Sequence, residues 1–357
     1  MYRNQPHQPL TPSSDPLFQQ VLRVHPEPFT YLNERSVHHL LTQDPLGYFR
    51  FVRNELLDLA YDRAALELPP KRVFSDPDAE GDFRVMPCVV RNAQGARKTV
   101  KIVGTNTCQQ IVPDQITVGK VLVIHPEENF VSVVMEACLF SSARTGMCAA
   151  QAIDLLASSK AKVTVIGAGR VGYYAAFYTA FLSGVREIVL SDSHMQRAQA
   201  AAHSLAEQLP AIRFKAEAME HLEETDVLIL ATTSKEPLYG PDDFPARVIV
   251  SLGADTNTQH ELDPRWAGAA DLFVDTEESA RYGDLHAWLE AGLIHLDQVR
   301  DLLALLRNGP PQQSRRPAIF FSTGSALFDN ITAGYILHRT ADRSIAPIGK
   351  TSLEVSL

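Results

Sequence analysis

The sequence predicts an α/β protein in which a Rossmann-type, doubly wound parallel sheet is joined to a second, α+β domain. The first observation is the stretch from Lys162 to Asp192, where a β-branched run, a glycine-rich turn, a helical segment and a second apolar run follow in order. The second is that short apolar runs recur after it, each with the length of a buried parallel strand. The third is a change to β-rich runs between residues 72 and 134.

The glycine turn has the pattern G-x-G-x-x-G in the context that a dinucleotide requires. Val163 to Ile166 is typical of a buried strand and leads directly into Gly167, Gly169 and Gly172. The first glycine allows the tight turn, the second lets the backbone approach a pyrophosphate, and the third lets the helix pack on the sheet. The N–H groups and the dipole of that helix favour an anion at its N-terminus. The predicted pyrophosphate contacts are Gly167, Gly169, Arg170, Val171 and Gly172.

An acidic residue follows the second strand of this unit. The strand is predicted from Glu187 to Leu190, and Asp192 lies 20 residues after Gly172. A carboxylate at this point can accept hydrogen bonds from the ribose hydroxyls of the cofactor and repels a 2′-phosphate. The sequence therefore favours NAD over NADP.

The chain before the glycine turn predicts two helices, a sheet and a third helix. Asn33 can cap a helix that continues through Leu41, and apolar residues recur at helical spacing from Tyr48 to Leu59. A long helix is expected from Glu136 to Ala157. The strands of the mixed or antiparallel sheet are expected at Phe83–Val90, Thr99–Val103, Lys120–His125 and Phe130–Val134.

The chain after Asp192 continues the pattern of alternating helices and strands. Helices are predicted at His194–Leu209, Asp284–Arg307 and from Ala326 to about Arg339, and strands at Val227–Leu230, Val248–Leu252, Leu272–Asp275 and Ile319–Phe321. Thr232 and Thr233 follow one of these strands. Because ligands of open α/β sheets bind at the carboxyl ends of the strands, both threonines are candidate cofactor contacts.

Composition excludes several classes of protein. The 357 residues suffice for two domains, and the net charge of −9 argues against nucleic acid or an anionic membrane surface as partner. The chain lacks a signal-like start and any apolar run of spanning length, so a cytoplasmic location is expected. Cys88, Cys108, Cys138 and Cys148 have no metal-ligand spacing, so no metal site is predicted and free thiols are expected.

Outside the glycine turn, four ionisable residues are candidates for chemistry: Arg72, Lys101, Arg144 and Asp255. Lys101 lies in an apolar strand, so it either protects a sheet edge or binds an anion while buried. Asp255 follows the strand that ends near Leu252 and reaches the ligand edge of the sheet, but an aspartate there could equally cap a helix. The residues alone leave both alternatives open.

Several short motifs occur together in this chain: Pro70-Lys-Arg72, Met86-Pro87, Val100-Lys101, Ser141-Ser-Ala-Arg144-Thr145-Gly146, Gly167-Ala-Gly169, Gly253-Ala-Asp255 with Glu261-Leu-Asp263, and Ser322-Thr-Gly324 with Asp329. With these motifs, the chain resembles the ornithine cyclodeaminase/mu-crystallin family from about residue 30 to 340. Two stretches, Lys101 to Thr105 and Val134 to Thr145, are similar to the branch that oxidises an N-(carboxyethyl)-glutamate adduct.

The resemblance implies roles for these residues. The positions that match Arg72, Lys101 and Arg144 hold a substrate carboxylate, and the position that matches Asp255 is an acid or base at the substrate nitrogen. Lys101 is accordingly also a catalytic candidate, and Thr145 and Ser322 match positions that touch the cofactor. The family further implies a homodimer and a discontinuous substrate-binding and dimerisation domain, residues 1–145 with 321–357, beside a dinucleotide-binding domain of residues 146–320.

Three functions are consistent with these features. The first is an NAD-dependent oxidoreductase that acts on the Cα–N bond of an amino acid or an N-(carboxyalkyl) amino acid, because the fingerprint accompanies three cationic residues. The second is a cyclodeaminase that uses NAD catalytically, although ornithine cyclodeaminases carry a lysine where this chain has Gln259. The third is a nucleotide- or small-ligand-binding protein without turnover.

Overall fold

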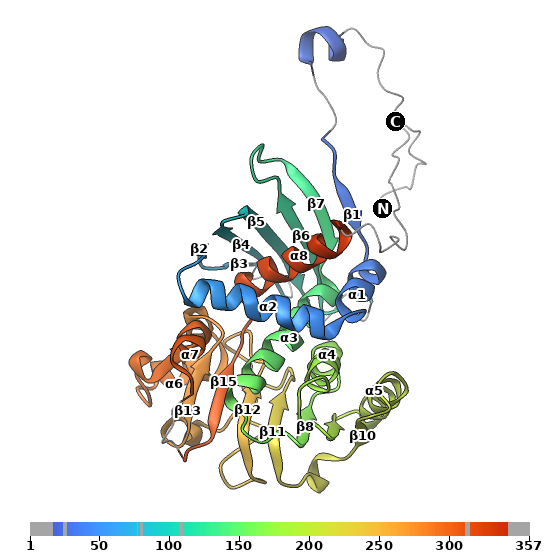
Figure 1. Ribbon diagram of the computed structural model, residues 1–357. Coiled ribbons are helices and arrows are strands. Elements are labelled where there is room, and N and C mark those ends of the chain that lie inside the picture. The colour runs from blue at the N-terminus through green and yellow to red at the C-terminus, as the bar shows by residue number, and fades with distance from the viewer. Residues whose placement is uncertain are drawn as a thin grey trace.

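Two sheets, one mixed and one parallel, make up the framework of the molecule, and helix α3 (Cys138–Leu156) runs between them (Figure 1). The two helices, the sheet and the third helix that were predicted before the glycine turn are all present. The computed structural model describes residues 17–23, 27–76, 78, 81–106, 110–113, 115–310 and 315–341.

The first sheet has seven strands in the order β1-β7-β6-β5-β4-β2, and β3 also pairs with β4. Strands β4 to β7 are antiparallel neighbours and β1 is parallel to β7, so the predicted mixed sheet is confirmed. The sequence did not predict β1, β2 and β3, which are too short to show a pattern. The strands are β1 (Thr30–Leu32), β2 (Ala65–Glu67), β3 (Arg72–Ser75), β4 (Asp82–Asn92), β5 (Gly95–Thr105), β6 (Thr117–Ile124) and β7 (Val131–Glu136).

One face of this sheet is covered by α8 (Ala326–Ala341), with α1 (Glu34–Thr42) and α2 (Pro45–Ala60) packed against α8. The predicted cap is confirmed, because the side chain of Asn33 accepts a hydrogen bond from Ser36 N at 2.9 Å. Helix α3 has no cap of its own. The carboxylate of Glu34 accepts hydrogen bonds from the first two N–H groups of α3, both at 2.9 Å, and so fixes α3 to α1.

The second sheet has eight parallel strands in the order β10-β9-β8-β11-β12-β15-β13-β14. Its first five positions, β10-β9-β8-β11-β12, follow the 3-2-1-4-5 order of a Rossmann sheet, which confirms the predicted fold class. Strand β10 was not predicted. The strands are β8 (Lys162–Ile166), β9 (Glu187–Ser191), β10 (Arg213–Ala216), β11 (Thr225–Leu230), β12 (Ala246–Ser251), β13 (Asp271–Val274), β14 (Val299–Asp301) and β15 (Ala318–Phe321).

The helix predicted over Asp284–Arg307 is wrong as a single element. Helix α6 ends at Glu290, and Gly292 follows with a φ of +66°, which does not continue a right-handed helix. After a 3-10 turn and β14, a new helix begins where Asp301 caps it by accepting from Ala304 N at 2.6 Å. The apolar spacing is helical on both sides of this break, so periodicity alone did not reveal it.

The helices that cover the second sheet, with the short helical turns of the chain, complete the architecture. They are α4 (Arg170–Thr179), α5 (Met195–Gln208), α6 (Gly283–Glu290), α7 (Leu302–Asn308), the π-turn η1 (Leu17–Leu22), and the 3-10 turns η2 (Met219–His221), η3 (Pro264–Gly268), η4 (Glu277–Arg281) and η5 (Leu296–Gln298).

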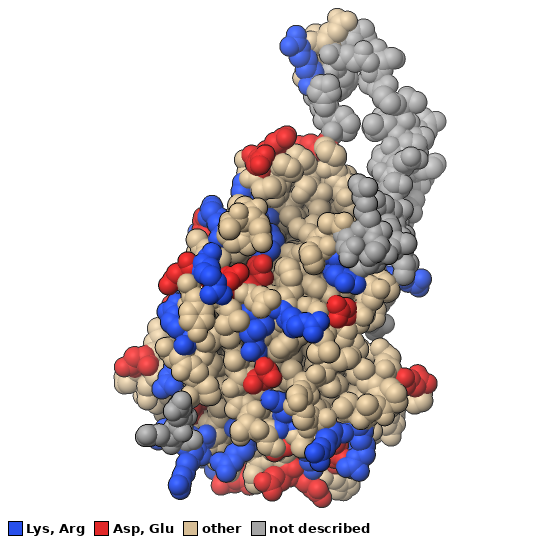
Figure 2. All heavy atoms as spheres, viewed as in Figure 1, with Lys and Arg blue, Asp and Glu red and all other residues tan. Residues whose placement is uncertain are grey.

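The surface and the cysteines fit the composition. On the face shown in Figure 2, acidic and basic side chains are interspersed. In the part of the chain that the structure describes, no helix combines the length and apolarity needed to span a bilayer. Cys88, Cys138 and Cys148 are buried free thiols, whereas Cys108 lies outside the described residues.

Candidate active site

The glycine turn connects β8 to α4 and is shaped to approach a phosphate. Gly167 has a φ of +98°, and a Cβ there would lie 2.4 Å from the carbonyl oxygen of Ala231. A Cβ on Gly172 would lie 1.8 Å from the carbonyl oxygen of Gly167, so neither position accepts a side chain. Around a Cβ built at Gly169 there is no atom within 4 Å, and no side chain caps α4. The start of α4 therefore offers an uncapped helix N-terminus beside open space.

Asp192 lies next to this turn, directly after β9. One of its carboxylate oxygens accepts a hydrogen bond from Ala168 N at 2.8 Å, and the other accepts from His194 N at 2.8 Å. Its side chain is only 9% exposed, so the charge is held in place beside the glycine turn. This is the position from which an acidic group meets the adenosine ribose in a Rossmann sheet.

Replacing Asp192 with Asn is expected to shift the preference toward NADP. The amide keeps an oxygen acceptor but removes the charge that repels a 2′-phosphate, so the ratio of kcat/KM for NADP to that for NAD should rise roughly tenfold or more. Steady-state kinetics with both cofactors measures this ratio, and a melting curve checks that the variant is folded. An unchanged ratio in a folded variant would remove Asp192 from the cofactor site.

Glu261 joins the carboxyl ends of two neighbouring strands, β11 and β12. One oxygen accepts from the backbone N and the hydroxyl of Thr232 at 2.7 and 3.0 Å, and the other accepts from Ser251 Oγ and Gly253 N at 2.8 and 3.0 Å. Burial raises the pKa of Glu261, whereas these four hydrogen bonds lower it because they favour the charged form. Thr232 is thus held at the ligand edge of the sheet, with the exposed Thr233 beside it.

The two other predicted cofactor contacts lie nearby on buried segments. Thr145, on α3, donates its hydroxyl hydrogen to the carbonyl oxygen of Ser141 at 2.8 Å. Ser322 follows β15 and donates to Asp275 Oδ2 at 2.7 Å. Asp275 also accepts from Ser279 Oγ at 2.6 Å, so the turn after β15 is tied to η4.

Lys101 and Arg144 meet at one carboxylate, that of Asp329 on α8. Lys101 Nζ lies 2.8 Å from Asp329 Oδ2, and Arg144 Nε lies 2.9 Å from Asp329 Oδ1. Lys101 is 2% exposed on β5, which lies between β4 and β6, so the edge-strand interpretation of this lysine is wrong. Burial, and next the neighbouring Arg144, lower the pKa of Lys101 to about 7, while Asp329 raises it. Arg144 Nη1 is buried and has no hydrogen-bond partner among the described residues.

The structure does not bring Arg72 to these two cations. Arg72 pairs with Val85 on β4, and directly opposite residues of paired strands project to the same face. Since Val85 alternates with the buried Arg84, Arg72 projects to the other face of the sheet, where its side chain is exposed. Lys71, one residue earlier, is buried instead, and its Nζ donates to the carbonyl oxygen of Thr323 at 3.1 Å. The predicted cluster of Arg72, Lys101 and Arg144 is therefore wrong at Arg72, and the buried cation of this segment is Lys71.

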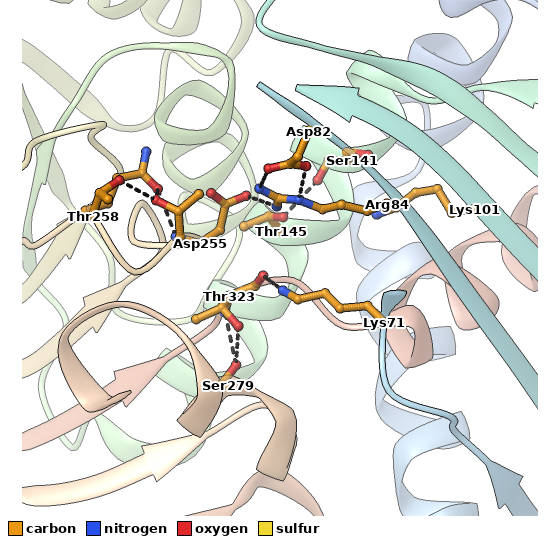
Figure 3. Close-up of polar contacts among 12 residues, drawn as sticks. Lys71, Asp82, Arg84, Lys101, Ser141, Thr145, Asp255, Thr258, Ser279 and Thr323 are labelled. Carbon is orange, nitrogen blue, oxygen red and sulfur yellow. Dashed lines mark hydrogen bonds and ion pairs between the residues drawn. The ribbon is translucent and has the colours of Figure 1, made fainter. Parts of the chain in front are cut away.

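Asp255 reaches across from the second sheet to Arg84 of the first (Figure 3). Arg84 Nη1 donates to Asp255 Oδ2 at 2.7 Å, while its Nε and Nη2 donate to the two oxygens of Asp82 at 2.7 and 3.0 Å. The loop after Asp255 contains no helix, so the capping interpretation is not supported. The backbone N–H of Asp255 donates to Gln259 Oε1 at 3.2 Å, and its side chain remains 38% exposed.

Three residues of the cluster were not assigned a role from the sequence. Arg84 could have been found, because it occupies an inward position of β4 in alternation with Met86 and Cys88. Asp329 carries part of the family resemblance, but its pairing with Lys101 joins residues 228 apart in the chain. Lys71 directly precedes the exposed Arg72, and only the position of β3 decides which of the two is buried.

These groups form a site that faces both sheets. Arg144 and Lys101 present positive charge from α3 and β5, and Asp255 presents a carboxylate from the loop after β12. Such an arrangement can hold a carboxylate and exchange a proton with a neighbouring atom of the same molecule. The glycine turn and Asp192 lie on the sheet that carries Asp255, and their geometry fits a dinucleotide.

Comparisons with known proteins identify a family model and several similar sequences and structures. Residues 53–344 match the model of the ornithine cyclodeaminase/mu-crystallin family. The chain is 28% identical over 231 residues to the iminosuccinate reductase of Paracoccus denitrificans, which covers 63% of this chain and 72% of that protein.

Two solved structures share the fold. The Δ1-pyrroline-2-carboxylate reductase of Thermococcus litoralis, in complex with NADH and L-proline, superimposes with a TM-score of 0.78 at 21% identity, over 89% of this chain and 99% of that chain. An archaeal alanine dehydrogenase dimer with bound NAD superimposes with a TM-score of 0.76 at 22% identity, over 89% and 98% of the two chains.

Proposed function

Since the chain belongs to the ornithine cyclodeaminase/mu-crystallin family, we propose that it is an NAD-dependent oxidoreductase that acts on the Cα–N bond of an amino acid or an N-(carboxyalkyl) amino acid. The observation that carries this proposal is the buried, unpartnered Nη1 of Arg144, beside Lys101 and within the same site as Asp255. A buried cationic donor without a partner is costly unless a ligand completes it. Relatives named as an imino-acid reductase, an amino-acid dehydrogenase and a pyrroline-carboxylate reductase support the reaction class.

The cofactor would be held by the carboxyl edge of the second sheet. NAD supplies the hydride acceptor or donor when it is bound. The pyrophosphate would meet the start of α4, and the ribose hydroxyls would meet Asp192. The proposed contacts are Gly167, Gly169, Arg170, Val171, Gly172, Asp192, Thr145, Thr232, Thr233 and Ser322.

The substrate would be held from the first sheet. Arg144 and Lys101 bind the α-carboxylate with charge-assisted hydrogen bonds and so orient Cα. Asp255 accepts a proton from the substrate amine at Oδ1 or Oδ2 as the imine forms, and returns it in the opposite direction. Because its pKa is lowered to about 7, Lys101 can also take part in proton transfer. Arg84 keeps Asp255 directed at the site.

The direct test is NADH absorbance across a panel of amino acids, cyclic imines and carboxyethyl amino acids. Turnover of at least one amino acid or imine with a stoichiometric change in NADH is expected. Release of ammonia from ornithine without net NADH would instead indicate a cyclodeaminase. Tight NAD binding with no reaction across the panel would favour a binding protein.

We also propose that residues 1–145 with 321–357 form the substrate and dimerisation domain, and residues 146–320 the dinucleotide domain. Support comes from α8, which returns to pack on β4, β5 and β6 after the second sheet is complete. The face of the first sheet that α8 does not cover supports a homodimer. On this face, a row of paired residues across strands β4 to β7 is apolar: Pro87, Val100, Leu122 and Val134. The neighbouring Ile102 is 41% exposed.

Replacing Ile102 with Glu is expected to convert the dimer to a monomer. A carboxylate buried in an apolar interface without a partner is strongly unfavourable, so the sedimentation coefficient should fall to that of a 39.4 kDa chain. Leu293→Glu is the matched control, because Leu293 is 50% exposed next to the second sheet. A wild-type monomer, or a dimer that survives Ile102→Glu, would contradict the proposed interface.

A further inference from the structure

Lys71 is a buried lysine without a direct ion pair among the described residues, although Asp255, Glu278 and Asp275 lie close enough to raise its pKa. Its side chain is 7% exposed; Nζ donates to the carbonyl oxygen of Thr323 at 3.1 Å and lies 3.7 Å from the ring centroid of Tyr282. No described carboxylate oxygen lies within 4.0 Å of this Nζ. An ammonium group has three donors, of which the carbonyl and the ring engage two. Burial lowers the pKa of Lys71 to about 8.

Lys71 lies next to the position proposed for the α-carboxylate. The carbonyl that it contacts belongs to Thr323, and a Cβ built on the next residue, Gly324, would lie 2.9 Å from Arg144 Nη2. Consecutive residues of one turn therefore contact the two cationic heads. Figure 3 shows the side chain of Lys71 directed at Thr323, below the pair formed by Arg84 and Asp255.

The charges of the site form a pattern with three points. Lys101 and Arg144 share the single carboxylate of Asp329, which leaves one positive charge in excess. Arg84 is shared by two carboxylates, which leaves one negative charge in excess at the side of Asp255. Lys71 adds a second positive point. An amino acid with two carboxylates has the complementary set, two negative charges and one positively charged nitrogen.

We propose that Lys71 binds a second anionic group of the substrate, so that this site selects amino acids and imino acids with two carboxylates. This inference rests on the proposed oxidoreductase function and names its substrate class. The α-carboxylate occupies the Arg144 position, the nitrogen faces Asp255, and the second carboxylate completes the third donor of Lys71. Without a second substrate carboxylate, Lys71 stays buried with no described carboxylate in direct contact with its Nζ, which is unfavourable for a charged group.

The test compares reductive amination of oxaloacetate and 2-oxoglutarate with that of pyruvate and 2-oxobutyrate, with ammonia or methylamine and NADH. The wild type is expected to prefer the dicarboxylates. In Lys71→Met the ratio of kcat/KM for dicarboxylates to that for monocarboxylates should fall roughly 10- to 100-fold, mainly through KM, because one charged hydrogen bond is lost. Lys71→Arg should restore most of the ratio. Arg72→Gln, which removes the adjacent cation on the opposite face, is the matched control and should keep the ratio within about threefold.

Binding of non-reacting acids to the NAD-loaded protein separates this inference from the proposed reaction. Calorimetry with succinate and butyrate should show tighter binding of succinate to the wild type and loss of that difference in Lys71→Met. If no oxo acid is turned over, the proposed reaction fails, while the succinate result still decides the role of Lys71. Equal losses for mono- and dicarboxylates, or a wild type that prefers monocarboxylates, would overturn the inference.

Discussion

Replacing Asp255 with Asn lowers kcat by roughly 100- to 10,000-fold, the range expected for removal of a general acid or base. The amide occupies the same volume but cannot hold the proton that leaves or returns to the substrate nitrogen. Cofactor affinity should change little, because Asp255 contacts Arg84 and Gln259 rather than the glycine turn. Steady-state kinetics across pH, with NADH binding followed by fluorescence, measures both effects.

Asp82→Asn is the matched control for that experiment. It removes the other carboxylate of Arg84 and leaves Asp255 in place. A purely structural role for the ion pair predicts equal losses in the two variants, whereas an acid-base role predicts a much larger loss of kcat in Asp255→Asn and the disappearance of one limb of its pH profile. Equal losses with an unchanged pH profile would assign Asp255 to positioning alone.

Replacing Asp329 with Asn destabilises the folded protein by about 3–5 kcal/mol, the cost of leaving buried charge without its partner. Asp329 is 1% exposed and is the shared counter-ion of Lys101 and Arg144, so its neutralisation leaves the buried guanidinium of Arg144 without its carboxylate and lowers the pKa of Lys101 further. Urea unfolding of the wild type and the variant, followed by circular dichroism, gives the difference in the free energy of unfolding.

The double variant Lys101→Met with Asp329→Asn tests whether this cost is electrostatic. Removing one of the two cations should recover part of the lost stability, so the two substitutions should be less than additive. Additive losses would show that Asp329 stabilises the fold through packing of α8 and not through the charges it pairs. Glu55→Gln is a comparison at a less buried ion pair, with Arg97, where a smaller loss is expected.

The substrate side of the site was predicted incompletely, and each error has a physical cause. Whether Lys101 was an edge or a buried residue depended on the position of β5 within the sheet, which is set by its pairing with β4 on one side and β6 on the other. The choice between Arg72 and Lys71 depended on a shift of one residue, which reverses the face of every side chain in a strand. Arg84 was accessible from alternation alone, because β4 has one consistently buried face.

The sequence by itself determined the cofactor half of this protein. The strand, the glycine turn, the helix and Asp192 are contiguous, so local steric and electrostatic requirements appear directly as residue types at fixed spacing. Only the tertiary structure decided which charges face one another in the substrate half, because the ionisable groups come from the segment before β3, from β4, β5, α3 and α8, and from the loop after β12. A buried charge is stabilised by partners that are distant in sequence, and folding alone brings those partners within a few ångströms.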